Sequence, residues 1–195
     1  MSKNFANPAI VLKLCINGLG VSRCLGHHGV QVIGLSQDQN LPGIYSRFIS
    51  EIWKYNGQEE DMIELLLQKR DLFDAPPVLY AITDAQVLAL VAHLDRLRDH
   101  YLIGLPPKPE LVIRTISKKG FHKMTDQYKL PAPQTVFIDN PGEIEQIAGK
   151  MKYPCIIKPE FRSPAFARVA KQKALCCHES KSLVAFYHSF CQADP

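Results

Sequence analysis

The sequence predicts an α/β protein that begins with a Rossmann-like domain built on a parallel sheet. Aliphatic runs of strand length alternate with segments of helical periodicity through the first half of the chain, which is typical of βαβ architecture. The first two runs are joined by only Asn17-Gly18-Leu19-Gly20 and a short helical segment. Such a short strand–helix–strand connection favours parallel strands with a right-handed crossover.

The first domain is expected to cover residues 1–104. The run at 10–16 is apolar except for Lys13, as in a strand covered on both faces. Gly29 ends the first helix, and Thr83 with Asp84 begins the third. The predicted strands are 10–16, 30–35, 48–53 and 78–82, and the predicted helices are 21–28, 59–69 and 85–97.

A second domain, residues 105–195, is expected to follow the proline-rich stretch Leu105-Pro106-Pro107-Lys108-Pro109, because closely spaced prolines interrupt regular structure. Asp139 or Asn140 caps a helix whose first turn contains Pro141. The predicted helices are 110–115, 118–128, 143–151 and 179–190, and the predicted strands are 134–138, 153–158 and 173–177. We interpret this half as two linker helices followed by an incomplete α+β subdomain.

The composition excludes several classes of function. Hydrophobic residues make up 46% and charged residues 22% of the 195 residues, as in soluble globular domains. The net charge of +4 comes from scattered basic residues, so we expect no nucleic-acid partner. No apolar run approaches the ~20 residues of a membrane span, and no signal peptide is visible at the start. The six cysteines form no Cys-x-x-Cys pair, so we expect a cytoplasmic protein with reduced thiols and no metal ligands.

A lysine at the end of an apolar strand is the first candidate functional residue. The stretch Tyr153-Pro154-Cys155-Ile156-Ile157 leads into Lys158, and Pro159 follows. A buried strand carries a cation only at its end, where the amine can meet an anion. We interpret Lys158 as a phosphate ligand. The alternative is an ordinary solvated lysine at a strand end.

Further cations in the second half complete this candidate site. Lys118 begins a predicted helix, with Lys119 as the alternative if the helix starts one residue later. The basic loop at 161–171 adds Arg162 and the Ser163 hydroxyl. A nucleoside triphosphate spreads its charge over many oxygens, and donors from separate elements suit it.

The glycines of the first connection invite a different interpretation, because a glycine turn before a helix also binds dinucleotide phosphates. With Gly18 and Gly20 as the first two glycines of that fingerprint, the third position is Arg23, whose side chain prevents close helix–strand packing. NAD(P)-dependent oxidoreduction therefore stays the weaker alternative.

The motifs of the second half resemble those of the ATP-grasp superfamily. They are Ser117-Lys118, the turn Leu130-Pro131-Ala132-Pro133-Gln134-Thr135 and the strand Tyr153-Pro154-Cys155-Ile156-Ile157-Lys158-Pro159. Lys129 stands where that turn usually has glycine. The first domain, with Asn17-Gly18-Leu19-Gly20 and Tyr45-Ser46-Arg47, is similar to the Rossmann-like domain that precedes the grasp in carbamoyl-phosphate synthase-like and related carboxylate–amine ligases.

This resemblance implies that Lys118 and Lys158, with Arg162 and Ser163, contact the phosphates of ATP. It implies an ATP-dependent ligase that activates a carboxylate as an acyl phosphate for attack by an amine or thiol. Mg²⁺ is expected as a second cofactor, with its ligands outside this chain, and no catalytic residue is assigned. We therefore expect the amino-terminal piece of a longer ligase, inactive alone.

The resemblance also bears on the substrate site and on assembly. Loop residues near Gly18, Gly20, Ser46 and Arg47 are expected to help form the substrate site. The expected partners of the full-length protein are ATP and a carboxylate substrate, and a homodimer is left open. The competing hypothesis is a non-catalytic α/β module that binds a small ligand or a partner subunit.

Overall fold

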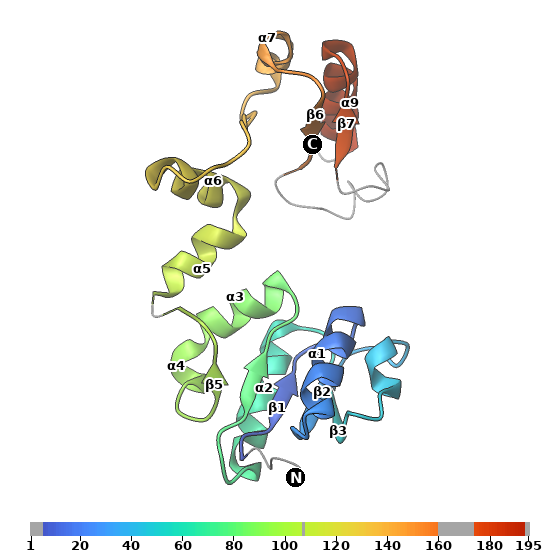
Figure 1. The fold of residues 1–195 in the computed structure, drawn as a ribbon, viewed down its shortest axis with the longest axis vertical. Coiled ribbons are helices and arrows are strands. Elements are labelled where there is room, and N and C mark those ends of the chain that lie inside the picture. The colour runs from blue at the N-terminus through green and yellow to red at the C-terminus, as the bar shows by residue number, and fades with distance from the viewer. Residues whose placement is uncertain (1–5, 107, 160–173, 194–195) are drawn as a thin grey trace. The chain divides into compact units, whose positions relative to one another are not determined.

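A computed structural model describes residues 6–106, 108–159 and 174–193 of the chain. The chain divides into two compact units, Met1–Ile113 and Arg114–Pro195, and helix α5 (Pro109–Ile116) spans the division (Figure 1). This division falls later than the predicted domain boundary after residue 104, which stays a prediction. None of the helices described is both long and apolar enough to cross a membrane.

The first unit is built on a five-stranded parallel sheet in the order β3-β2-β1-β4-β5 (Figure 1). Its strands are β1 (Ala9–Val11), β2 (Val32–Ser36), β3 (Glu51–Lys54), β4 (Val78–Tyr80) and β5 (Leu102–Ile103). The central strand β1 places Ile10 opposite Ile33 of β2 and opposite Leu79 of β4. The predicted α/β class with a parallel sheet is confirmed.

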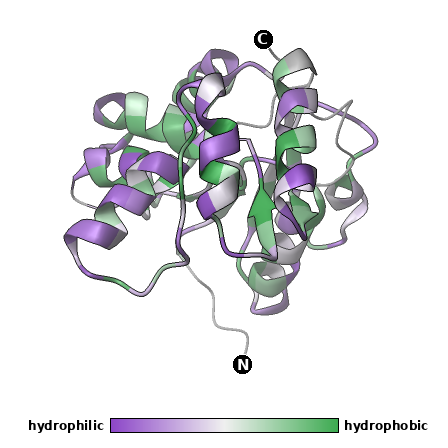
Figure 2. Cartoon of the chain, turned by 90° about the horizontal axis from the view of Figure 1, so that it is seen from above, coloured by the Kyte–Doolittle hydropathy of each residue, from purple (hydrophilic) through white to green (hydrophobic). Residues whose placement is uncertain are grey.

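Helices cover both faces of this sheet. Ile10 of β1 and Leu12, which directly follows the strand, point to one face of the sheet. This face packs against α2 (Glu59–Lys69), α3 (Asp84–Ala92) and α4 (Leu94–Leu97). Val11 points to the opposite face, which is covered by α1 (Ile16–His27) and the 3-10 helix η1 (Pro42–Tyr45). The alternation follows from the two-residue period of a strand. The helices carry both hydrophilic residues, in purple, and hydrophobic residues, in green (Figure 2), as helices with one face in a core do.

The first connection differs from its prediction, because Asn17-Gly18-Leu19-Gly20 forms the start of α1 rather than a turn. The strand ends at Val11, and residues 12–15 make the connection. Gly18 is buried, and a Cβ atom there would overlap the carbonyl oxygen of Lys13. The glycine therefore lets the helix pass close to the preceding loop. A Cβ on Gly20 would meet no atom within 4 Å.

The last part of the first unit also departs from the prediction. Thr83 caps α3 in a capping box with Gln86, as the sequence indicated, but the helix expected at 85–97 is interrupted at His93. The buried Gln86 also donates to the Leu12 carbonyl at 2.7 Å. The short strand β5 was not predicted, because two residues carry no periodicity.

The second unit combines helices with a two-stranded antiparallel sheet. Its elements are α6 (Lys118–Gln127), the 3-10 helix η3 (Pro141–Glu143), α7 (Ile144–Lys150), β6 (Cys155–Ile157), β7 (Leu175–Cys177) and α9 (Ser180–Ala193). Asn140 caps η3 by accepting from Gly142 N. The buried core of this unit consists of Ile144, Ala148, Cys177 and Leu183.

The strand predicted at 134–138 does not form, since this stretch has no regular secondary structure. Pro131 and Pro133 remove backbone donors just before it. Phe137 contacts His122 of α6 instead, and Ile138 packs against the core of the unit. The turn that leads into it is a Schellman motif: Leu130 N donates to Thr125 O at 2.8 Å and Lys129 N to Asp126 O at 3.3 Å. Lys129 takes the left-handed conformation, with φ of 51°.

Candidate functional site

The second unit contains a cavity of about 760 Å³ with both candidate lysines on its wall. Its walls are α6, the segment 132–139, residues between 147 and 159 from α7 through β6, and one side of α9. A cavity of this size accommodates a molecule as large as a nucleotide. The strand-end lysine, Lys158, comes directly after β6, and Lys118 is the first residue of α6.

Helix α6 presents one face to the cavity. Its cavity-lining residues are Lys118, Phe121, His122 and Thr125, and their spacing of three and four residues places them along one side of a helix. The helix begins at Lys118 because the Ser117 side chain accepts a hydrogen bond from Gly120 N at 3.1 Å. The sequence analysis identified only Lys118; helical spacing from it would have found the other three.

The amine of Lys118 reaches the backbone next to Lys158. Lys118 Nζ donates to the carbonyl oxygen of Pro159 at 3.0 Å, and Pro159 is the neighbour of Lys158. The amine of the helix lysine therefore lies beside the end of β6, where the strand lysine also emerges. Two cations at one end of a cavity attract an anion with several charged oxygens.

The adjacent lysine has a different partner. Lys119 Nζ donates to Asp139 Oδ1 at 2.8 Å and to Oδ2 at 2.9 Å, and its amine also lies 5.9 Å from the Phe137 ring centroid. The sequence left open whether Lys118 or Lys119 belongs to the site. The geometry favours Lys118, which lines the cavity.

The rest of the cavity wall is mixed: apolar side chains such as Leu183 and Phe190 line it together with polar ones such as Gln134 and Asp139. Burial raises the pKa of the Tyr187 phenol, which also lines the cavity, to about 12. Burial likewise raises the pKa of the Cys155 thiol, although a hydrogen bond with Cys177 opposes the shift. Lysines on a wall that also offers apolar surface and neutral polar groups suit a ligand that joins a polyphosphate to an uncharged ring system.

The other predicted site residues are not joined to this cavity by the described structure. Arg162 and Ser163 lie outside the described residues. Gly18 and Gly20 are in the first half of α1, whereas Arg47 lies over the ring of Phe48 at 4.9 Å, and Phe48 packs on Gly26. Gly26 is about 12 Å further along the helix than Gly18. The substrate site expected at Gly18, Gly20, Ser46 and Arg47 stays a prediction.

The first unit has its own cavity, of about 500 Å³, between α1 and the sheet. None of the described residues on its wall is Lys, Arg, Asp or Glu, and its polar groups include Asn7 and His28, so it suits a polyphosphate less well than the lysine-lined cavity does. Within the described ranges, no group of three or more His, Cys, Asp or Glu side chains can hold a metal ion. The lysine-lined cavity is therefore the candidate site.

No family model matches the sequence, and neither does any curated protein. N5-carboxyaminoimidazole synthetase from Staphylococcus aureus, solved with ADP, is 14% identical and has a TM-score of 0.66 over 96% of this chain and 44% of its own. L-amino acid ligase from Bacillus licheniformis is 13% identical, with a TM-score of 0.64 over 96% of this chain and 43% of its own. The biotin carboxylase domain of Hydrogenobacter thermophilus 2-oxoglutarate carboxylase, solved with MgADP, is 12% identical. Its TM-score is 0.65 over 94% of this chain and 40% of its own.

The chain has the amino-terminal ATP-grasp fold. The resemblance drawn from the sequence is thereby confirmed as a shared fold. The chain spans less than half the length of the ATP-grasp structures that it matches.

Proposed function

We propose that this chain supplies the phosphate-binding lysines of an ATP-dependent carboxylate–amine or carboxylate–thiol ligase. One observation carries the proposal: Lys118 Nζ lies 3.0 Å from the carbonyl oxygen of Pro159, next to Lys158, on the wall of a cavity of nucleotide size. The shared fold supports it, because the matched structures include a ligase and two enzymes solved with ADP.

Lys118 and Lys158 would hold the phosphates from two directions, one from a helix and one from a strand end. Each ammonium group is a compact cation that donates three hydrogen bonds. Together they would neutralise part of the polyphosphate charge and orient the terminal phosphorus. The apolar wall near Tyr187 would exclude water from the nucleoside, which strengthens the electrostatic attraction.

The proposed reaction has two displacements. A carboxylate oxygen attacks the γ-phosphorus of ATP, the bond from that phosphorus to the β–γ bridging oxygen breaks, and ADP leaves. An amine or thiol then attacks the acyl carbon, the acyl carbon–oxygen bond breaks, and inorganic phosphate leaves while the nucleophile loses its proton. Positioning and charge neutralisation supply most of the catalysis in phosphoryl transfer.

Mg²⁺ would neutralise the phosphate charge that the lysines leave unbalanced. The described residues contain no cluster of three His, Cys, Asp or Glu side chains for it. On the strength of the sequence resemblance alone, we propose that its ligands lie outside this chain, and that the chain does not complete the reaction by itself. A cytoplasmic location and a homodimer stay predictions.

Replacing Lys158 with methionine tests the phosphate role. In the natural protein that carries this chain, Lys158→Met should weaken ATP binding by about 10- to 100-fold, the equivalent of one charge-assisted hydrogen bond, with little change in melting temperature. Isothermal titration calorimetry and thermal unfolding measure the two quantities. Lys150→Met, which removes an exposed lysine that is not on the cavity wall, is the matched control. A large fall in melting temperature with unchanged ATP affinity would show that Lys158 is structural.

The reaction class needs a separate experiment. ADP release that depends on a carboxylate, together with trapping of the acyl phosphate by hydroxylamine as a hydroxamate, would support the ligase. Substrate libraries of carboxylates and amines would then identify the pair. If the natural protein binds neither ATP nor ADP in the presence of Mg²⁺, the ligase proposal fails and a non-catalytic binding module replaces it.

A further inference from the structure

Two consecutive lysines at the start of α6 have different partners. Lys118 Nζ reaches the carbonyl oxygen of Pro159, while Lys119 Nζ makes a two-oxygen ion pair with Asp139. Consecutive residues of a helix point about 100° apart, so one helix turn directs two equal charges to separate places. Of these two lysines, Lys118 lines the cavity and Lys119 does not, whereas Asp139 forms part of the cavity wall.

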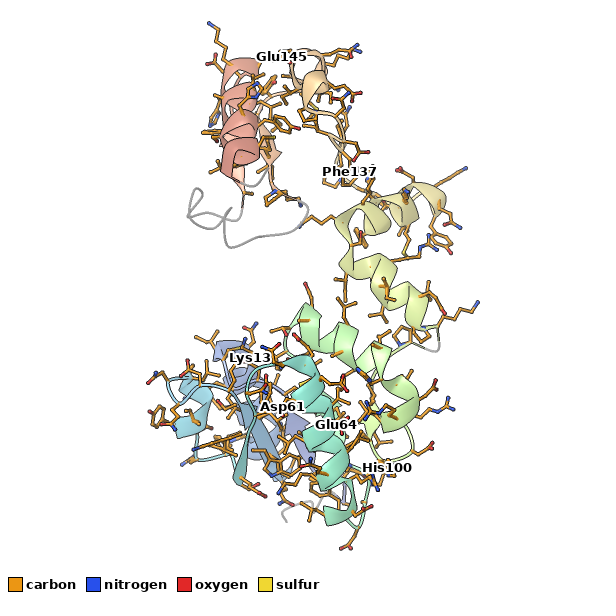
Figure 3. The ribbon with its side chains drawn as sticks, turned by 180° about the vertical axis from the view of Figure 1, so that it is seen from behind. Lys13, Asp61, Glu64, His100, Phe137 and Glu145 are labelled. Carbon is orange, nitrogen blue, oxygen red and sulfur yellow. The ribbon has the colours of Figure 1, made fainter. Side chains whose placement is uncertain are left out.

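Aromatic contacts accompany the ion pair. Phe137, labelled in Figure 3 on the segment between α6 and α7, has its ring centroid 5.6 Å from that of His122 and 5.9 Å from Lys119 Nζ. The segment thus runs back along α6, from the Schellman turn at the end of the helix to its first turn. Lys119, His122, Phe137 and Asp139 form a clasp that joins the segment to α6.

The clasp matters because the segment has few other contacts to fix it, chiefly the packing of Ile138 against the core of the second unit. Residues 131–136 are exposed, and the stretch 129–139 has no helix or strand of its own. Yet residues 132–139 supply one wall of the cavity. Side-chain contacts with α6 therefore help to determine where this wall lies, and they fix it relative to the helix end that carries Lys118.

We propose that Lys119 and Asp139 are positioning residues that hold Lys118 and the segment 132–139 in the geometry needed for nucleotide phosphates. This inference rests on the proposed function, since it assigns the pair a role at the same site. A direct phosphate role for Lys119 is disfavoured, because the Asp139 carboxylate already accepts its hydrogen bonds and would repel a phosphate beside it.

Exchanging the two charges tests the pair. Lys119→Asp and Asp139→Lys, made singly in the natural protein, should each weaken ATP binding by about tenfold through misplacement of Lys118. The double variant restores the ion pair with reversed polarity and should return the affinity to within about threefold of wild type. Lys123→Asp, which makes the same charge change on an exposed position one turn along α6, is the matched control and should change the affinity less than the clasp variants.

A second readout separates positioning from general destabilisation. The affinity for AMP, which lacks the β- and γ-phosphates, should change less than the affinity for ATP, so the single variants should lower the ATP-to-AMP affinity ratio. Melting temperatures should change little, because exposed ion pairs contribute little to the free energy of unfolding. Loss of ATP and AMP binding in parallel with a lower melting temperature would overturn the positioning role.

Asp139→Asn decides between positioning and direct contact. If Lys119 itself binds phosphate, Asp139→Asn should tighten ATP binding because it removes the competing carboxylate. In that case the double variant with exchanged charges should not regain the wild-type affinity. Either result overturns the inference while leaving the proposed function intact. If wild type binds no ATP, the proposed function fails, and the role of the pair fails with it. Rescue in the double variant, with weaker ATP binding in Asp139→Asn, supports the inference.

Discussion

The first unit surrounds a five-stranded sheet with helices and buries apolar clusters on both of its faces. The second unit has a two-stranded sheet and one small cluster, whose buried members are Ile144, Ala148, Cys177 and Leu183. The candidate nucleotide site lies in the more thinly packed unit. A wall made of exposed, irregular backbone can adjust to a ligand at low cost, whereas a sheet packed on both faces cannot.

This contrast predicts that close packing governs the first unit. Gly18→Ala should destabilise it by about 3 kcal/mol, because the added Cβ overlaps the Lys13 carbonyl oxygen and the helix or loop must shift. Gly20→Ala, in the same helix with open space around it, should stabilise it by up to about 1 kcal/mol. Denaturation followed by Trp53 fluorescence reports on this unit, since Trp53 is the only tryptophan. Equal effects of the two variants would show that α1 does not pack as described.

The second unit should be the first to unfold. Leu183→Ala removes one of its four buried core side chains and should cost about 3 kcal/mol, enough to unfold the unit while the first remains folded. Circular dichroism should show partial loss of helix with unchanged Trp53 fluorescence. Leu66→Ala makes the same change in the larger core. If Leu183→Ala alters both probes together, the units do not unfold independently.

Alkaline pH should distinguish the units as well. Burial raises the pKa of Tyr101 to about 12, above about 10 for an exposed tyrosine, and its hydroxyl donates to Leu66 O at 2.6 Å. The folded first unit therefore holds this proton more tightly than the unfolded chain does. Its stability is retained below pH 10 and should fall by on the order of 2 kcal/mol as the pH rises to 12. Tyr101→Phe should reduce the loss of unfolding free energy between about pH 10 and pH 12. It should also lower the free energy of unfolding by about 1 kcal/mol at every pH, because the hydrogen bond to Leu66 is lost. An identical pH profile of stability in both proteins would contradict this role of Tyr101.

The smallest effect is expected at Lys129. Its left-handed φ of 51° costs a residue with a Cβ about 1 kcal/mol, so Lys129→Gly should stabilise the second unit by about that amount and reduce the difference between the units. Lys123→Gly, inside α6, should destabilise it by a similar amount. The circular dichroism transition of the second unit measures both. A destabilising Lys129→Gly would mean that the side chain makes contacts that outweigh the strain.

Local patterns predicted much of this fold. Helix α2 has the predicted bounds, Glu59–Lys69, because Met62, Ile63 and Leu66 repeat at helical spacing and are buried. The Thr83 cap was readable from its residue type. Gly18 and Gly20 led to the wrong prediction of a turn. A glycine such as Gly18, which a helix needs for close packing, cannot be told apart in the sequence from a glycine that a turn needs.

The candidate site was predictable only in part. Lys118 and Lys158 follow from sequence motifs, but their approach to one another depends on how α6 meets the end of β6. The strand expected at 134–138 satisfied the apolar pattern, yet Phe137 packs against His122 of α6 rather than within a sheet. That choice is made by tertiary contacts between residues well separated in the sequence, and a local pattern does not encode it.

The short β6–β7 ladder affects how this chain behaves at high concentration. Within the described residues each of its strands pairs only with the other, and the sequences Cys155-Ile156-Ile157 and Leu175-Cys176-Cys177 carry no charge. The edge strand β3 of the first unit, by contrast, begins with Glu51 and ends with Lys54, and charges of this kind discourage pairing between molecules. We therefore expect β-mediated self-association to begin at β6 and β7, where a lysine in place of the exposed Cys176 would improve solubility.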